Sequence, residues 1–302
     1  MHDVLTQALS LVAIILLGQL LRRAGFFTRE DFPKLSRLML TVTLPCALIT
    51  YFDSFQIDKK LYYLIFIGIA VNLIQGIAAY LLTRRESAKE QAFAIIHSGS
   101  YNIGAFAMPY MQAFMAAESL VYSSLFDIGN ALTEAGSNYG LAMAIGKKEK
   151  LSAKNLLLQM LHSPVFVTYL FLLILQLSGL RLPSEIIRFT SIVGEANTFL
   201  AMFIIGLALD LKIGRGKLKK AFRILLRRYL FALLFSLVTI FLLPLGEQEK
   251  TVLCLIYFAP IAAMSAGFTA EIDGDIELAG FISSFSILVS IVVMPLILLI
   301  LK

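Results

Sequence analysis

The sequence predicts an all-α integral membrane protein in which ten transmembrane helices form two inverted five-helix repeats. The composition is the first reason. Hydrophobic residues make up 59% of the 302 residues and charged residues 15%, whereas soluble domains average about 45–50% apolar and about 25% charged residues. The mean hydropathy is +0.83. The other two reasons are basic residues that gather in alternate connectors and two prolines that recur at one offset in both halves.

Ten segments are long and apolar enough to span a bilayer, which takes about 20 mostly apolar residues. They are 4–21, 32–52, 61–83, 91–115, 119–146, 155–178, 186–211, 222–243, 251–270 and 276–301. Ser, Gly, Asn and Pro interrupt the fourth and ninth segments. The chain opens without the basic region and cleavage site of a signal peptide, so we expect the first segment to remain as a membrane helix.

The basic residues predict the orientation. If the N-terminus lies outside, 20 of the 26 lysines and arginines fall in cytoplasmic connectors, as the positive-inside rule requires. This count assigns Arg227 and Arg228 to the connector before the eighth segment. Connector 271–277 is acidic instead, but acids carry little weight in the rule. An even number of spans then places both termini outside, and the net charge of +6 reflects topology and contact with lipids rather than nucleic acid.

The two halves of the chain, 1–150 and 151–302, repeat one pattern. Pro109 follows the start of the first segment by 105 residues, and Pro260 follows the start of the sixth by the same distance. Each half has five spans, an odd number, so the second half enters the membrane the opposite way up. Matched, interrupted segments in inverted halves indicate the substrate site of a transporter.

Each of these prolines is expected to break its helix, because proline lacks a backbone N–H. Broken backbone is tolerated in a bilayer only where it meets protein or water. The freed helix N-termini carry partial positive charge and suit an anion. A simple proline kink is the alternative interpretation. The candidate substrate-binding residues are Asn102, Ile103, Gly104, Pro109, Pro260 and Ser265.

The fifth segment carries a polar stripe. Its members recur every three or four residues, so they share one helix face; they are Ser123, Asp127, Asn130, Glu134 and Asn138. A carboxylate within a bilayer is costly unless it faces a cavity, pairs across helices or is protonated. Asp127, Asn130 and Glu134 are therefore candidates for coupling a proton or sodium ion to transport. Structural support of the neighbouring helices is the other interpretation.

Signals of catalysis are missing from the sequence. It contains no P-loop, GxGxxG, HExxH or GxSxG motif. The two cysteines, Cys46 and Cys254, have no metal-site spacing. We therefore expect no enzyme, no cofactor and no metal site.

Several short motifs resemble the auxin efflux carrier family, which includes the plant PIN-formed exporters and many bacterial carriers. They are LGQLLRRAGFF (17–27), LPCAL (44–48), NIG (102–104) with Pro109, GLAL (206–209), AP (259–260), AEID (270–273) and SS (283–284). Their order and spacing cover essentially the whole chain. The connector 147–154 is much shorter than the long cytoplasmic loop of many plant members.

The resemblance implies that helices four and nine cross at mid-membrane, an architecture shared with bile acid:sodium symporters. It implies a scaffold of helices 1, 2, 6 and 7, and a transport domain of helices 3–5 and 8–10. Elevator-type alternating access, a homodimer and contact of Asn102 with a substrate carboxylate follow from the same resemblance. Bacterial relatives are associated with malonate, malate and other organic acids.

Together these observations predict a secondary carrier for a small organic anion in a bacterial inner membrane. A sodium-coupled organic-anion symporter is one alternative, which the sodium dependence of flux would separate. A membrane receptor that binds a ligand without moving it is another, and a channel is a third.

Overall fold

The computed structural model describes residues 2–28, 30–53, 55, 58–149 and 152–301. All regular structure in these ranges is helical, and they contain no strand. The first half comprises α1 (His2–Arg23), α2 (Asp31–Leu38), η1 (Met39–Thr43), α3 (Leu44–Asp53), η2 (Lys59–Tyr62), α4 (Tyr63–Leu82), α5 (Ala88–Ser98), η3 (Ile103–Ala107), α6 (Met108–Phe114), α7 (Glu118–Leu132), η4 (Thr133–Asn138) and α8 (Tyr139–Gly146). The second half comprises α9 (Ala153–Leu161), α10 (Pro164–Ser178), α11 (Ser184–Ala208), η5 (Arg215–Lys217), α12 (Leu218–Leu242), α13 (Glu247–Tyr257), α14 (Met264–Glu271) and α15 (Ile276–Leu301).

Six of the ten predicted spans are helices long and apolar enough to cross a membrane, counted over the residues that the structure describes. They are Leu5–Arg23, Asp31–Asp53, Lys60–Leu82, Ser184–Ala208, Arg215–Leu242 and Ile276–Leu301. The all-α, multi-pass character of the chain is therefore confirmed. Of the other four predicted spans, 91–115, 155–178 and 251–270 are divided into shorter helices. The span 119–146 is a continuous run of α7, η4 and α8 that is not among these six. The ten-span inverted repeat therefore stays a prediction.

The fourth and ninth predicted segments are both interrupted, but only one break lies at the expected proline. Pro260 is inside the gap between α13 and α14. The first gap, 99–102, precedes Pro109 by seven residues, and Pro109 is the second residue of α6, which continues from η3. The prediction that Pro109 itself breaks the helix is wrong. Pro109 lies just after the π-helical turn η3, and a local π turn of this kind lets a membrane helix tolerate the N–H that proline lacks.

The sixth predicted span, 155–178, is also divided. The side chain of Ser163 accepts a hydrogen bond from the N–H of Phe166, and Pro164 is the first residue of α10. A serine cap followed by proline at the first helical position is a strong start signal. Gly179, with φ +69°, ends the helix in the left-handed conformation that glycine adopts readily.

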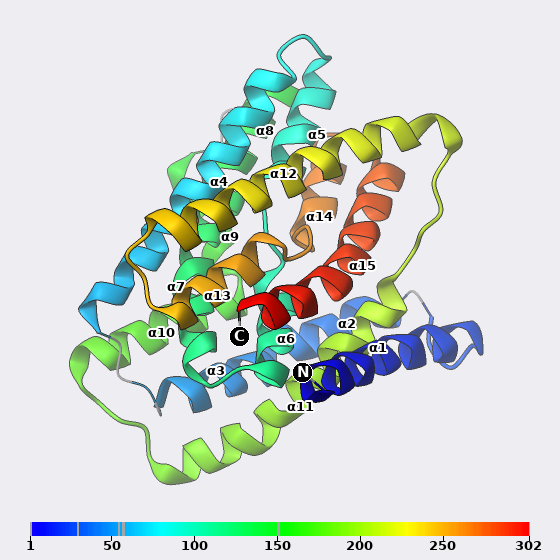
Figure 1. Ribbon diagram of the computed structural model, residues 1–302. Coiled ribbons are helices and arrows are strands. Elements are labelled where there is room, and N and C mark those ends of the chain that lie inside the picture. Colours follow the sequence, from blue (N-terminus) through cyan, green and yellow to red (C-terminus); the bar gives the residue numbers. More distant parts are fainter. Residues whose placement is uncertain (1, 29, 54, 56–57, 150–151, 302) are drawn as a thin grey trace.

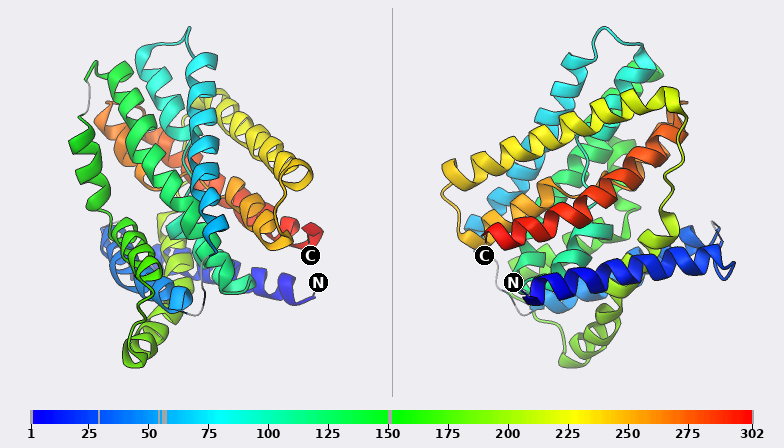
Figure 2. Two further views of the ribbon diagram at one scale, coloured as in Figure 1. Left: turned by 90° about the vertical axis from the view of Figure 1, so that its left-hand side faces the viewer. Right: turned by 45° about the vertical axis from the view of Figure 1, so that its right-hand side comes forward.

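The helices form two groups (Figures 1 and 2). One contains α1 and α3, which both pack along α11, with α2 against α11 and α10 against α3. The other contains α4 to α8 and α12 to α15, in which α4 packs on α7 and α5 on α8. The start of α1 and the end of α15 lie close together in both figures.

Close helix contacts in each group depend on small residues. A Cβ added to Gly206 would lie 2.1 Å from the Ile15 carbonyl oxygen, where α11 meets α1. One added to Gly129 would lie 2.1 Å from the Ile65 carbonyl oxygen, where α7 meets α4. Small residues let helix backbones approach closely in membranes, where packing rather than the hydrophobic effect drives association.

Gly129→Ala is therefore expected to destabilise the fold by about 1–3 kcal/mol, the usual cost of overpacking, because the obstructing atom is backbone. The measurement is the melting temperature in detergent. Gly136→Ala is the matched control, since a Cβ there meets nothing within 4 Å. Equal melting temperatures for the two variants would contradict the close α4–α7 contact.

Three of the four acids in the connector 271–277 form ion pairs with lysines from neighbouring segments. Lys147 Nζ lies 2.8 Å from the Asp273 carboxylate, and Lys217 Nζ lies 2.8 Å from Asp275. Lys217 also pairs with Glu277. Burial raises the pKa of Asp275, but Lys217 outweighs this effect and holds that pKa below its usual value. The acidic connector therefore lies next to basic residues of two other connectors, Lys147 and Lys217.

We expect the melting temperature to fall as pH is lowered through the pKa of Asp275. A carboxyl whose pKa is depressed in the folded state stabilises it only while ionised, and this contribution disappears on protonation. Lys217→Met should lower the melting temperature at pH 7 and flatten the decline in acid. Lys219→Met serves as the control, because Lys219 is exposed and has no ion pair among the described residues. Parallel pH curves for wild type and Lys217→Met would count against this coupling.

Candidate functional site

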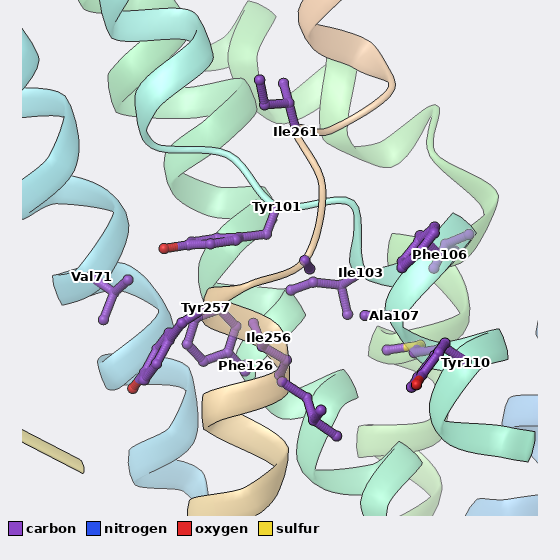
Figure 3. Close-up of a cluster of buried hydrophobic side chains, with 14 of the residues drawn as sticks. Val71, Tyr101, Ile103, Phe106, Ala107, Tyr110, Phe126, Ile256, Tyr257 and Ile261 are labelled. Atoms are coloured by element: carbon purple, nitrogen blue, oxygen red, sulfur yellow. The ribbon is translucent and has the colours of Figure 1, made fainter. Parts of the chain in front are cut away.

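The two interrupted segments meet at their gaps. The N–H of Asn102 donates to the carbonyl oxygen of Pro260 at 2.9 Å. The hydroxyls of Ser100 and Ser265 are 3.0 Å apart. Figure 3 shows the extended segment that carries Tyr101 passing beside the one that carries Ile261. Backbone groups that have left their helices are thus satisfied by protein, as they must be inside a membrane.

A buried arginine joins the two gaps. Arg228, on α12, is only 1% exposed. Its Nη1 donates to the Ser98 carbonyl at 3.3 Å. Its Nη2 donates to the carbonyls of Ala259 at 3.0 Å and Pro260 at 3.1 Å. The guanidinium also lies 4.7 Å from the centre of the Tyr101 ring, a cation–π distance.

The position of Arg228 corrects the assignment made from the basic residues. It was counted with a cytoplasmic connector, whereas the structure buries it within a helix. One signal could have revealed this. Residue 228 lies inside the predicted span 222–243, and a charged residue within a span indicates a functional or paired group.

A cavity of about 480 Å³ lies between the two groups of helices. It extends from Asn102 to Arg22 and Asp210, at the end that the basic residues place in the cytoplasm. Apolar and small side chains make up most of the lining; they include Phe32, Met39, Leu40, Ala105, Ala201, Ile204, Ile205, Ile261, Ala263, Ala266 and Ile287. The Arg22 guanidinium donates to the carbonyls of Leu207 and Leu209. We call this space the large cavity.

A second cavity, of about 150 Å³, also has Asn102 in its wall and is lined by the acidic residues of the fifth segment. We call it the small cavity. Asp127, Asn130 and Glu134 all line it, as expected for residues on one helix face. Backbone of residues 101–105 forms part of its wall.

Asn130 and Asp127 hold the first gap in place. Asn130 accepts a hydrogen bond from the N–H of Tyr101 at 3.2 Å and donates to the carbonyl of the same residue at 3.1 Å. It also donates to one Asp127 oxygen at 2.8 Å. The other Asp127 oxygen accepts from the hydroxyl of Tyr169, on α10, at 2.7 Å. Each Asp127 oxygen thus accepts a hydrogen bond, and Asp127 links the two groups of helices.

Glu134 has fewer hydrogen-bond partners than Asp127 among the described residues. It lies in η4, is 9% exposed, and its Oε1 has no hydrogen-bond partner among the described residues. Within that part of the chain it also has no lysine, arginine or histidine nitrogen within 4 Å. A buried carboxylate without a partner is costly. Of the two acids, Glu134 is therefore the one with an oxygen that no described residue engages.

The structure separates the predicted substrate-binding residues into two sets. Asn102 lines both cavities, and its side-chain amide has no hydrogen-bond partner within the described ranges. Ile103 and Gly104 line the small cavity. Pro109, Pro260 and Ser265 do not line either cavity. Their carbonyl or hydroxyl groups hold neighbouring helices instead, with Pro109 accepting from Thr198 at 3.2 Å.

Three π-helical turns border the cavities. They are η1, which contributes Leu40 to both; η3, which contributes Ala105 to both; and η4, which contributes Glu134 to the small one. Such wide turns are rare and occur mostly at functional sites. The sequence pattern does not identify them, because an extra residue per turn leaves no compositional mark.

A family described as membrane transport protein matches residues 3–155, just over half of the chain. The chain belongs to this family. It is the auxin efflux carrier family that the short motifs resemble. An uncharacterized transporter of Methanothermobacter thermautotrophicus is similar to this family member: it is 24% identical over 295 residues, which is 95% of each chain. Both similarities are to transporters, so this auxin efflux carrier family member is a multi-pass membrane transporter.

Proposed function

We propose that the protein is a secondary active carrier for a small organic anion in a bacterial inner membrane. The observation that carries this proposal is the position of Asn102. Its side-chain amide has no hydrogen-bond partner among the described residues and lines both cavities, at the point where two interrupted helices meet. Binding at such a point, reached in turn from either side, is the arrangement that alternating access requires.

The preference for an anion rests on helix ends. The first N–H groups of a helix lack intrahelical partners and carry partial positive charge. The helical segment η3–α6 begins directly after Asn102, and α14 begins after Ala263, which lines both cavities. The amide of Asn102 adds two further donors. A carboxylate at this point would face donors from both repeats.

The lining of the large cavity favours a monocarboxylate with an apolar body. Arg22 is the only lysine or arginine among its lining residues, and it stands at the far end with its guanidinium bound to backbone carbonyls. A second carboxylate would thus lie against apolar walls without a counter-charge, which is costly.

This preference is testable with a matched pair of acids. Hexanoate and adipate share a six-carbon chain and differ by one carboxylate. We expect hexanoate to raise the melting temperature of the detergent-solubilised protein, and adipate and malonate to raise it less. Stabilisation by the dicarboxylates alone would exclude the monocarboxylate preference.

Elevator-type movement of one group of helices against the other is part of the proposal. Few polar bonds oppose such movement between α6 and α11. Gln112 donates to the Gly194 carbonyl at 3.2 Å and accepts from Asn197 at 3.3 Å, and Thr198 donates to the Pro109 carbonyl at 3.2 Å. We propose that the predicted spans 1, 2, 6 and 7 form the scaffold and that the predicted spans 3–5 and 8–10 form the moving domain. The two repeats are then residues 1–150 and 151–302. Both termini lie outside, and the homodimer stays a prediction.

Flux in proteoliposomes tests the function as a whole. The purified protein is reconstituted, and uptake of a radiolabelled acid that stabilises it is followed in exchange against unlabelled acid. Saturable exchange supports a carrier. Saturable binding without flux would instead indicate a receptor, and single-channel conductance would indicate a channel.

A further inference from the structure

The carbonyls around Arg228 form the kind of site that a cation occupies. Ser98 is the last residue of α5, and Ala259 and Pro260 follow the end of α13. All three carbonyl oxygens accept from the same guanidinium. Carbonyls at helix C-termini carry partial negative charge. In carriers with broken helices, such half-helix ends coordinate the sodium ion.

In this protein a side chain supplies the positive charge. Arg228 has no carboxylate oxygen within 4 Å among the described residues. Its guanidinium interacts electrostatically with Glu134 at longer range and lies over the ring of Tyr101. The three carbonyls are therefore its main counter-charge. A buried cation is retained against its desolvation cost only where such groups hold it.

We propose that Arg228 is a built-in substitute for a coupling sodium ion, so that transport by this protein does not depend on sodium. This inference rests on the proposed carrier function. A sodium ion needs several oxygen ligands, and the oxygens at this point are already bonded to Nη1 and Nη2. The arginine is a positioning residue: it holds the two gaps, and thereby Asn102, in the geometry that binds substrate.

Arg228 differs from a bound sodium ion because its charge is part of the protein and cannot dissociate. A sodium ion binds and leaves in each cycle, and its gradient then drives transport. Arg228 stays on α12, so its charge is present in every step of the cycle. The contact between the two interrupted segments is consequently in place before substrate binds. The electrochemical sodium gradient therefore contributes no driving force.

The test compares wild type with Arg228→Gln, Arg228→Lys and Arg227→Gln. Arg227 is the matched control, because it is the adjacent arginine, is only partly buried and has no hydrogen bond to either gap. Exchange flux is measured in proteoliposomes with sodium chloride or choline chloride at equal ionic strength. Melting temperatures in detergent are measured in the same two salts, which requires no substrate.

Wild type and Arg227→Gln are expected to show the same flux in both salts. Arg228→Gln should lose about tenfold or more of its flux in choline, as expected for the loss of charged hydrogen bonds, and regain part of it in sodium. It should also melt higher in sodium than in choline, unlike wild type. Arg228→Lys keeps the charge and should retain more flux than Arg228→Gln in choline.

Two results would overturn the inference. One is acceleration of wild-type flux by sodium. The other is wild-type flux by Arg228→Gln in choline. If Arg228→Gln does not fold, flux by the folded Arg228→Lys variant that requires sodium would overturn it, and flux in choline would support it. If no acid is transported by wild type, the carrier function fails, whereas a sodium-dependent melting temperature confined to Arg228→Gln would still support the cation substitution.

Discussion

Replacing Asn102 by alanine is expected to weaken transport strongly while leaving the protein folded. The Asn102 side chain lines both cavities and has no hydrogen-bond partner in the described part of the chain, so its removal breaks no internal bond. A hydrogen bond to a charged group contributes about 1.5–3 kcal/mol, which corresponds to a loss of about 10- to 100-fold in affinity for the anion.

The measurement combines flux with a folding control. Initial exchange rates over a range of substrate concentrations separate a loss of affinity from a loss of turnover. The melting temperature and gel-filtration profile should match those of wild type. Asn102→Asp keeps the shape but adds a negative charge, and it should bind the anion more weakly than Asn102→Ala. Wild-type rates in the alanine variant would exclude Asn102 from the substrate site.

Glu134→Gln is expected to make transport indifferent to an imposed proton gradient. We propose that the proton is the coupling ion, because Glu134 lines the small cavity with one oxygen unpartnered within the described residues. The charged groups that interact with Glu134 are Asp127 and Arg228. Two other titratable residues, Tyr101 and Tyr169, also line the small cavity. If Asp127 and Glu134 were both ionised, these two acids and Arg228 would together carry a net charge of −1. One proton bound by the acids would neutralise this cluster.

Wild-type flux should respond at least severalfold to a pH gradient of one unit, since one unit changes the proton activity tenfold, or about 1.4 kcal/mol. Glu134→Gln should keep exchange but lose this response. Asp127→Asn is the comparison variant: both Asp127 oxygens are engaged by Asn130 and Tyr169, so it should lower the melting temperature. A pH response that survives in Glu134→Gln would assign the coupling elsewhere.

Local pattern was sufficient for much of this structure. The apolar composition predicted an all-α membrane protein. The matched prolines predicted breaks in the fourth and ninth segments, and both segments are interrupted, although only the second break lies at its proline. The spacing of Asp127, Asn130 and Glu134 placed them on one helix face, and they do line one cavity. These properties follow from neighbours within a few residues, which helix periodicity relates directly.

The sequence by itself thus determined the class of the fold, the membrane setting and the regions where backbone leaves its helices. Only the tertiary structure decided how those regions are held. It placed the first gap before Pro109, bonded Ser265 to Ser100, satisfied Asp127 but not Glu134, and buried Arg228 against both gaps. The physical reason is that each outcome depends on contacts between residues far apart in the chain. Whether a buried charge or amide finds a partner is a property of packing, and periodicity within one segment does not contain it.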